Sequence, residues 1–388
     1  MMQLKSFDKK DMSLIIFLVV NFLFGIKYLS RISSYYVLFS LLIVAFYTFI
    51  WLKKEEITRL FIKLKVSTEI LLILYLIFSI SLLYLVPKES LNVDRWSVIS
   101  SFWQNYFNNE YVYYAKSVAN NYPGPMPFYF ILALPFYLMN ELGFFSFSGI
   151  VLFVLLIKKH QKPLNYASIS FLFIATSLFY NWEICSRSNL FINGSLILIS
   201  IVYFFEKYKK NLSANLIFGI IFGLFISTRN VFVIPYIVAF LFALRTKKID
   251  FKNTFYIGII AITTFAATFL PFVWNHFEDF KLMNPFIVQT SLMPSEYTAL
   301  FIFISVILSF FCKKETDIYF YSGLTLFLTI LFYFGYTIFN YGFNNSFYES
   351  TADISYFILC LPFVIYHLFL NGKSEFTSNE TEIISSKY

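Results

Sequence analysis

Charged residues are scarce in this sequence. They make up 13% of its 388 positions, whereas hydrophobic residues make up 59% and the mean hydropathy is +0.69. So few charges exclude an ordinary soluble domain of this length, because its surface would aggregate in water. Apolar runs long enough to cross about 30 Å of hydrocarbon recur along the chain. Lipid leaves backbone groups no partner outside their own segment, so the runs are predicted to be helices.

Cysteine and nucleotide-binding motifs are also lacking. The three cysteines, Cys185, Cys312 and Cys360, stand singly with no CxxC or histidine spacing, which excludes a disulfide framework and a zinc site. No GxxxxGK[ST] or GxGxxG occurs, so an ATP-driven pump is not predicted, and we expect no cofactor. The net charge of +8 is dispersed over short loops and forms no basic face for nucleic acid.

What the sequence has instead is a series of predicted membrane spans. The first follows the basic residues Lys5, Lys9 and Lys10 like a signal peptide, but no small-residue cleavage site follows it, so we expect it to be retained. From Pro127 to Ile157 the chain crosses either once, with an added interfacial or re-entrant piece, or twice. The other spans are predicted at 13–29, 35–52, 69–86, 165–182, 189–206, 213–228, 230–245, 254–274, 297–312, 317–339 and 354–370.

The distribution of basic residues favours the single crossing, because cytoplasmic loops carry the excess of Lys and Arg. With one crossing, 22 of the 30 Lys and Arg residues are cytoplasmic, whereas with two crossings 11 are. The sequence thus predicts an all-α transmembrane bundle of about 12 spans over residues 1–372 with both termini cytoplasmic. Residues 373–388 are predicted to form a polar cytoplasmic tail.

This topology places five segments on one outer face, where we expect any chemistry to occur. They are Pro87 to Met126, Asn181 to Ser188, the turn at Arg229, Asn275 to Glu296, and Asn340 to Asp353.

The longest outer segment, 87–126, carries a candidate catalytic carboxylate. Asp94 follows the third span, where it could act as a base at the water boundary, or simply cap a helical segment from Arg95 to Phe107. Arg95 could pair with Asp94 or bind a phosphate. An apolar pattern at helical spacing predicts an amphipathic helix on the bilayer surface; its members are Trp96, Ile99, Phe102, Trp103 and Tyr106.

A rigid stretch, YPGPMP, ends this segment. Its prolines remove backbone donors and hold an extended chain. Tyr122 is a candidate wall of a substrate cleft; the alternative is that the prolines only turn the chain into the next helix.

Two arginines lie at the ends of later spans. Glu183 and Arg187 are four residues apart, so on a helix they would form a modest ion pair or face a functional cavity, with Asn189 at the same junction. Arg229 adds a second cation at the same level. Two such arginines suit a lipid-linked phosphate or pyrophosphate, whereas the alternative is interfacial snorkelling.

The last outer segments have the mixture of aromatic, carboxylate and amide side chains found in sugar-binding sites, although many inert loops share it. His276 and Asp279 belong to one of them. Asp353 begins a span and would need a partner such as Arg187 or Arg229.

The set DRWSV, YPGPMP, EICSRSN, STRN and ESTADISYF resembles the GT-C class of membrane glycosyltransferases, and more narrowly bacterial mannosyltransferase-like proteins. The likeness runs from Asp94 onward. It implies a polyprenyl-phosphate sugar as donor and Asp94 as the general base. The sequence differs from the usual pattern in two additional helices before the acidic loop and in lacking a second acidic residue beside Asp94. These differences argue against a metal-assisted mechanism and leave open a divergent or inactive member of the class.

Together, these patterns predict a membrane glycosyltransferase that moves a hexose, such as mannose, onto a glycan, lipid or protein acceptor at the outer face of the cytoplasmic membrane. Arg187 and Arg229 would hold the phosphate, and Glu183 would orient one of them. The alternatives are a polysaccharide polymerase or ligase, which shares lipid-pyrophosphate substrates, and a secondary transporter.

Overall fold

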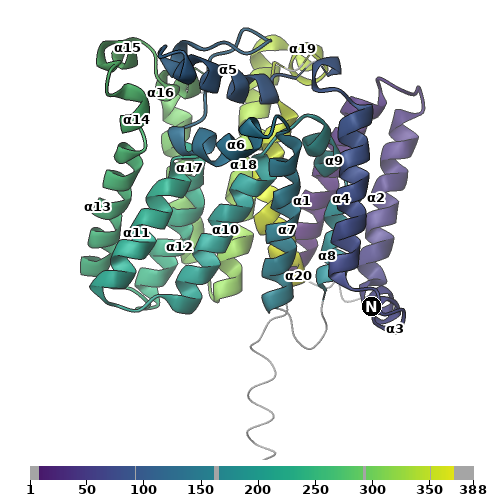
Figure 1. The fold of residues 1–388 in the computed structure, drawn as a ribbon. Coiled ribbons are helices and arrows are strands. Elements are labelled where there is room, and N and C mark those ends of the chain that lie inside the picture. The colour runs from purple at the N-terminus through teal and green to yellow at the C-terminus, as the bar shows by residue number, and fades with distance from the viewer. Residues whose placement is uncertain (1–7, 92, 161–165, 292–293, 350, 371–388) are drawn as a thin grey trace, which may run out of the picture.

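The computed structural model describes residues 8–91, 93–160, 166–291, 294–349 and 351–370, and the predicted tail at 373–388 lies outside them. Over these residues the regular elements are all helices (Figure 1). The predicted all-α class is therefore confirmed.

Six helices in the described part of the chain are long and apolar enough to cross a membrane. A seventh is added if the bent pair α2 (Tyr36–Leu52) and α3 (Lys54–Lys63), which meet at 71°, counts as one span. The six are α1 with the π-helical turn η1 (Lys9–Leu29), α4 (Thr68–Leu85), α7 (Gly143–His160), α10 (Leu190–Lys207), α13 with α14 (Phe251–Val273) and α18 (Glu315–Tyr341).

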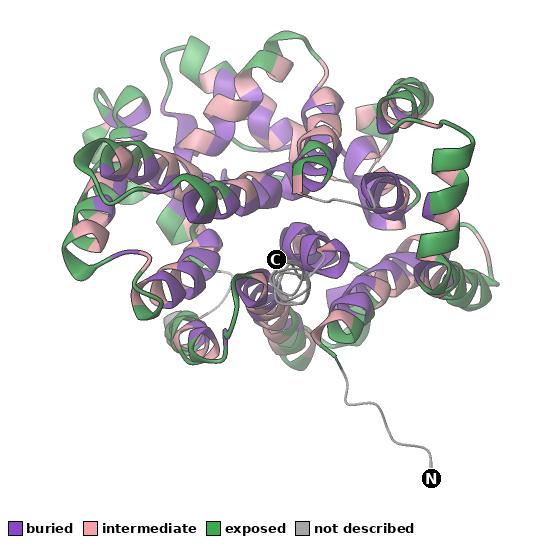
Figure 2. Ribbon diagram, turned by 90° about the horizontal axis from the view of Figure 1, so that it is seen from below, coloured by how far each residue is buried: buried purple, intermediate pink, exposed green. Residues whose placement is uncertain are grey.

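Buried residues line the inside of the bundle, and exposed residues lie on its periphery (Figure 2). Many of the exposed side chains are large and apolar: Leu42, Ile77 and Ile262 are 55%, 58% and 71% exposed. Such a surface is unfavourable in water and suits contact with lipid tails. The chain is a helical membrane protein.

Shorter apolar helices complete the bundle and begin and end near the predicted spans. They are α11 (Leu212–Ile226), α12 (Val233–Arg245), α17 (Ser295–Phe310) and α20 (Leu361–Phe369).

The predicted span 165–182 is wrong as a continuous helix. It is divided into α8 (Ala167–Ala175) and α9 (Leu178–Cys185). The Ser177 hydroxyl accepts a hydrogen bond from the Tyr180 N–H at 3.3 Å and so starts a new helix. The Asn181 amide donates to the carbonyl of Ala175 at 2.9 Å and pairs a backbone group at the break.

The stretch from Pro127 to Ile157 is also broken, at residues 139–142. It forms α6 (Pro127–Leu138) and α7. At 1.5 Å per residue α6 is about 18 Å long, well short of the about 30 Å of a hydrocarbon core. In Figure 1 it lies across the bundle beneath α5 (Arg95–Phe107). This geometry favours a single crossing by α7, with α6 as an added piece.

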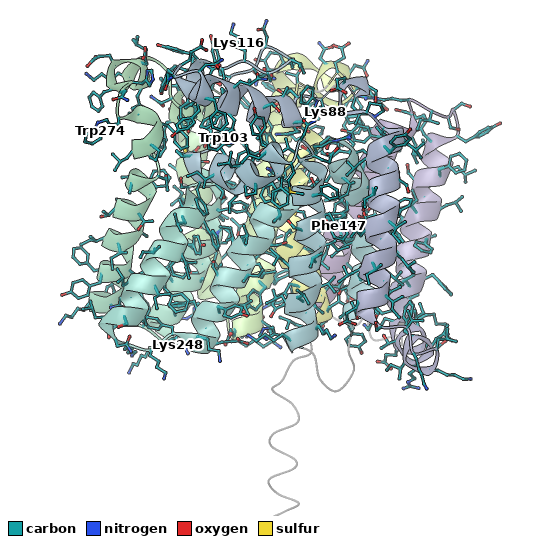
Figure 3. The ribbon with its side chains drawn as sticks, in the orientation of Figure 1. Lys88, Trp103, Lys116, Phe147, Lys248 and Trp274 are labelled. Atoms are coloured by element: carbon teal, nitrogen blue, oxygen red, sulfur yellow. The ribbon has the colours of Figure 1, made fainter. Side chains whose placement is uncertain are left out.

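One end of the bundle gathers the predicted outer segments, and we call it the loop end. Figure 1 shows α5, α15 (Phe277–Leu282), α16 (Pro285–Thr290) and α19 (Phe343–Phe347) there, with α3 at the opposite end. Lys88 and Lys116 lie at the loop end and Lys248 at the other (Figure 3).

The helix α5 has the predicted bounds, but its apolar face is covered by protein. The Phe102 ring stacks on Phe130 of α6 with centroids 3.6 Å apart, and Trp103 Nε1 donates to the Phe130 carbonyl at 3.2 Å. The Phe272 ring packs edge-on against the rings of Phe102 and Trp103. The predicted placement of this face on the bilayer surface is therefore corrected, and α5 is fixed to the bundle.

Glycine permits a close helix contact between α11 and α13. Gly219 and Gly223 share one face of α11 at the small-xxx-small spacing. A Cβ on Gly223 would lie 2.7 Å from the Thr264 Cβ and closer still to the Ala261 carbonyl oxygen. The two backbones can approach this closely only without that side chain.

Gly223→Val is expected to destabilise the protein by about 2 kcal/mol, because the added methyl groups must push α13 away. The measurement is the thermal unfolding temperature in detergent. Gly258→Val on α13 is the matched control, since nothing lies within 4 Å of its Cβ position. Equal melting temperatures for the two variants would contradict this account of the contact.

Candidate functional site

An ion pair joins α5 to the last apolar segment. The Arg95 guanidinium donates to the Asp353 carboxylate, and also to the Ser355 hydroxyl at 2.9 Å. Asp353 in turn accepts from the Ser355 N–H at 2.8 Å, at the start of η5 (Ile354–Cys360). Burial opposes ionisation of Asp353, but the Arg95 charge and the Ser355 hydrogen bonds outweigh it and hold the carboxyl pKa below its usual value.

The partner predicted for Asp353 was Arg187 or Arg229, and the structure corrects it to Arg95. The two side chains are 13% and 31% exposed, so the pair is partly desolvated. Arg95 does not pair with its neighbour Asp94, the other predicted arrangement, although the Asp94 charge acts on it.

Arg229 is held by aromatic rings. Its guanidinium carbon lies 5.3 Å from the centre of the Tyr129 ring and 5.7 Å from that of Tyr356. Arg95 lies 5.1 Å from the same Tyr356 ring, so one tyrosine serves two guanidinium groups. Arg229 Nε is buried without a hydrogen-bond partner among the described residues. This Nε–H donor therefore remains available to an anion.

Lys27 is a third cation near this site, and the sequence interpretation missed it. The side chain is 1% exposed, and its amine has no hydrogen-bond partner in the described structure. It lies in η1 (Gly25–Leu29), the π-helical turn at the end of α1, and π-turns often accompany functional sites. The charges of Asp353 and Arg31 act on its amine. A lone lysine near the end of an apolar run was the signal that could have revealed it.

We call Lys27, Arg95, Arg229 and Asp353 the basic cluster. Its one carboxylate is bonded to Arg95, so neither Lys27 nor Arg229 has a salt bridge within the described residues. Desolvated cations without partners are unfavourable, and an anion entering the cluster would relieve that cost. The arrangement is therefore suited to a phosphate group.

Glu183 and Asn189 are buried close to this cluster. The Glu183 Oε1 accepts from the Phe191 N–H at 2.9 Å, so the carboxyl lies at the N-terminus of α10, where the helix dipole favours an anion. Its Oε2 and the Asn189 Nδ2 have no partner in the described residues. The Arg95 and Arg229 charges act on Glu183.

Arg187 belongs to a different arrangement. The helix α9 ends at Cys185 and Arg187 has a φ of 55°, so the predicted four-residue pairing with Glu183 does not form. The guanidinium binds Glu141 through Nε at 3.2 Å and Nη2 at 3.4 Å. Its other bonds go to the carbonyls of Val86 (2.7 Å), Cys185 (2.6 Å) and Leu83 (3.0 Å). All five N–H donors are thus occupied, and none is left for a phosphate.

Asp94 immediately precedes α5 at the loop end of the bundle. Its Oδ2 accepts from the Ser117 hydroxyl at 3.0 Å and from the Asn121 amide at 2.7 Å. Asp94 occupies the N-cap position of α5, but its side chain makes no capping bond, so the capping alternative is wrong. Both bonds reach one oxygen. Oδ1 has no partner in the described part of the chain and is free to accept a proton.

Tyr122 lies apart from the cluster. Its ring centre is 5.2 Å from the Lys116 amine. The loop that carries it is held by Gln289, whose amide donates to the Gly124 carbonyl at 2.5 Å.

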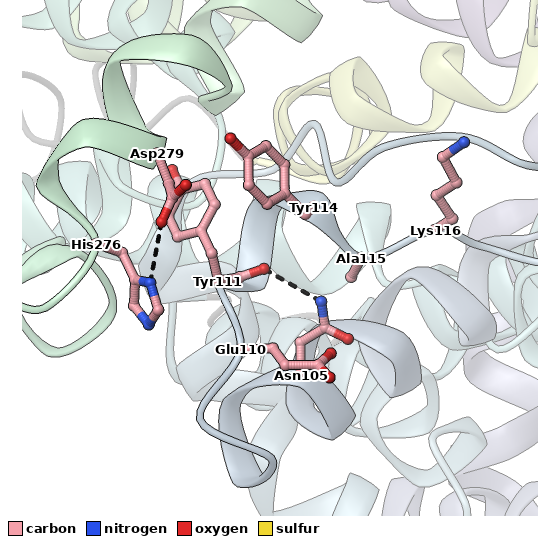
Figure 4. Close-up of a pocket in the computed structure, with 8 residues that line it drawn as sticks. All are labelled: Asn105, Glu110, Tyr111, Tyr114, Ala115, Lys116, His276 and Asp279. Carbon is pink, nitrogen blue, oxygen red and sulfur yellow. Dashed lines mark hydrogen bonds and ion pairs between the residues drawn. The ribbon is translucent and has the colours of Figure 1, made fainter.

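Lys116 also borders an open hollow at the loop end that includes His276 and Asp279 (Figure 4). Among the described residues, no group of three His, Cys, Asp or Glu could hold a metal ion.

No model of a known protein family, no curated protein and no solved structure matches this chain. The class is therefore defined by the structure itself: a helical membrane protein with a basic cluster at its loop end.

Proposed function

We propose that this protein is a GT-C-like membrane glycosyltransferase. It moves a hexose, such as mannose, from a polyprenyl-phosphate donor to a glycan, lipid or protein acceptor at the outer face of the cytoplasmic membrane. The observation that carries the proposal is the basic cluster: Lys27 is buried and Arg229 is half-buried, and neither has a carboxylate partner among the described residues, at the end of the bundle where Asp94 lies. A phosphate borne by a lipid would arrive at this depth and supply the missing anion.

The topology that accompanies the proposal uses the shorter helices as crossings as well, which gives about 12 spans with both termini cytoplasmic. The loop end is then outside. Lys248 and the other basic residues of the opposite end are cytoplasmic, as the positive-inside rule requires.

The chemistry follows from the placement of charges. The acceptor hydroxyl oxygen bonds to the anomeric carbon of the sugar, and the bond from that carbon to the phosphate oxygen breaks. Asp94 Oδ1 takes the hydroxyl proton. Lys27 and Arg229 stabilise the charge that grows on the leaving phosphate. Arg187, with its donors occupied, is left out of the proposed phosphate site, while Glu183 and Asn189 support the cluster from the start of α10.

Lys27→Met and Arg229→Gln are each expected to raise the KM for the lipid-linked donor about 10- to 100-fold, because each removes a charged donor to the phosphate. The measurement is transfer of radiolabelled mannose from a synthetic mannosyl-phosphoryl-polyprenol in proteoliposomes. Lys281→Met is the matched control, since this lysine is 55% exposed and pairs with Glu278 outside the cluster. Unchanged donor KM in both cluster variants would refute the phosphate site.

Product analysis separates the alternatives. A polysaccharide polymerase or ligase would give polymeric products in the same assay. A secondary transporter would take up a solute into vesicles without any lipid-linked sugar. Transporter sites lie near the bilayer midplane, whereas Lys27 is two residues from the end of the Lys9–Leu29 span, which favours the transferase.

A further inference from the structure

A hollow of about 570 Å³ opens at the loop end, and none of the four basic-cluster residues lines it (Figure 4). This volume falls within the range of about 300–1,000 Å³ common for small-molecule sites. Two segments far apart in the sequence form it, the end of α5 with the chain after it and the turn into α15. The lining side chains used below are Asn105, Glu110, Tyr111, Tyr114, His276 and Asp279.

Hydrogen bonds within the two segments, and one between them, position the lining of the hollow. The Tyr111 hydroxyl donates to the Met283 carbonyl at 2.6 Å, and Asn105 Nδ2 donates to the Tyr111 carbonyl at 3.1 Å. His276 Nδ1 lies 3.2 Å from Asp279 Oδ2, and its ring centre is 5.5 Å from that of Tyr111. A ligand would therefore meet side chains that are already ordered, which reduces the entropy lost on binding.

Tyr114 presents an aromatic ring to the hollow. It packs edge-on against Tyr111, with centroids 5.0 Å apart and planes at 84°, yet remains 40% exposed. A ring that is both held and open to water offers an apolar face to a ligand that also carries polar groups. The C–H face of a pyranose ring has this character.

The charges around the hollow disfavour an anion. Glu110 and Asp279 contribute carboxylates, and Lys116 contributes an amine at the edge. A phosphate would be repelled by the two carboxylates. A neutral polyol can instead donate to the carboxylates and accept from Lys116 and the Asn105 amide. Hydroxyl groups around an apolar ring face match this lining best.

The hollow also adjoins the candidate base. Lys116, at the edge of the hollow, immediately precedes Ser117, whose hydroxyl binds Asp94. We propose that the hollow binds a neutral saccharide, and, as far as the proposed function holds, that this saccharide is the acceptor whose hydroxyl is presented to Asp94.

The test measures saccharide binding without any transfer. Full-length protein in nanodiscs is titrated with oligosaccharides ending in mannose, glucose, galactose or N-acetylglucosamine and followed by saturation-transfer NMR. At least one series is expected to bind, and Tyr114→Ala to weaken it about tenfold through the lost ring face. Asp279→Asn should weaken it further, since a charged acceptor is removed.

The controls remove the same kind of side chain outside the hollow. Tyr341→Ala removes another exposed tyrosine, 59% exposed at the end of α18, and Glu278→Gln removes the carboxylate next to Asp279 in sequence. Both should bind like the wild type. The inference is overturned if no neutral series binds, if only inorganic phosphate or a sulfated sugar binds, or if Tyr114→Ala and Tyr341→Ala behave alike.

Failure of this site and failure of the proposed function are distinguishable. Saccharide binding that Tyr114→Ala removes, in a protein with no transfer activity, would uphold the site and refute the transferase. Transfer that is unaffected by Tyr114→Ala, with binding equally unaffected, would refute the site and leave the transferase standing. Asp94→Asn is expected to lose transfer and keep binding.

Discussion

Asp94→Asn is expected to reduce sugar transfer at least about 100-fold while the protein still inserts and folds. The amide cannot take the acceptor proton, and positioned bases contribute about 10²- to 10⁴-fold to such reactions. Asparagine keeps an oxygen for the Ser117 hydroxyl and the Asn121 amide, so the loop has little reason to move. The measurement is mannose transfer in proteoliposomes at saturating donor, with thermal unfolding as the check on folding.

Glu89→Gln is the matched control for this variant. Glu89 is an exposed carboxylate of the same outer segment, and its loss should leave transfer within about twofold of the wild type, as for a surface change away from the site. If Asp94→Asn retained more than a tenth of the activity, Asp94 would be removed from the mechanism. The basic cluster would then need a different base.

Arg187→Ala is expected to cost about 4 kcal/mol of stability, the largest effect we predict on folding. The side chain is 3% exposed, and its five donors tie the ends of α4 and α9 to Glu141. Its removal leaves buried carbonyls and a carboxylate without a partner. Arg187→Lys should recover little of this loss, because an ammonium group has three donors and no planar fork.

The measurement is unfolding in detergent, with Arg59→Ala as the control. Arg59 is exposed on α3, and its loss should cost within about 0.5 kcal/mol. Because Arg187 has no free donor, Arg187→Ala protein that remains folded should keep the donor KM of the wild type. A variant that melts like the wild type but has a raised donor KM would restore Arg187 as a phosphate ligand.

Local pattern was enough to locate most helices. Hydropathy predicted 69–86 and 189–206, and the structure has Thr68–Leu85 and Leu190–Lys207. The apolar spacing from Trp96 to Tyr106 predicted the helix α5. These predictions were correct because a helix in lipid must satisfy its own backbone groups, so its bounds depend on residues near one another in the sequence.

Contacts between distant segments could not be obtained in the same way. Arg95 and Asp353 are 258 positions apart. From the sequence alone, each could pair with several other charged residues, and only the folded structure shows which pair forms. For Glu183 and Arg187, the sequence predicted a pair that does not form. Their four-residue spacing indicated an ion pair, but the helix ends at Cys185 and the left-handed φ of Arg187 turns its side chain to Glu141.

The sequence by itself determined that this is a helical membrane protein and where most of its helices lie, because hydrophobicity and helical periodicity are local properties. Only the tertiary structure decided which charged residues meet. It paired Arg95 with Asp353, occupied every donor of Arg187, and left buried Lys27 and half-buried Arg229 without a carboxylate among the described residues. The physical reason is that a buried charge is stabilised by whichever partner packing brings within reach, and packing joins segments that the order of the chain keeps apart.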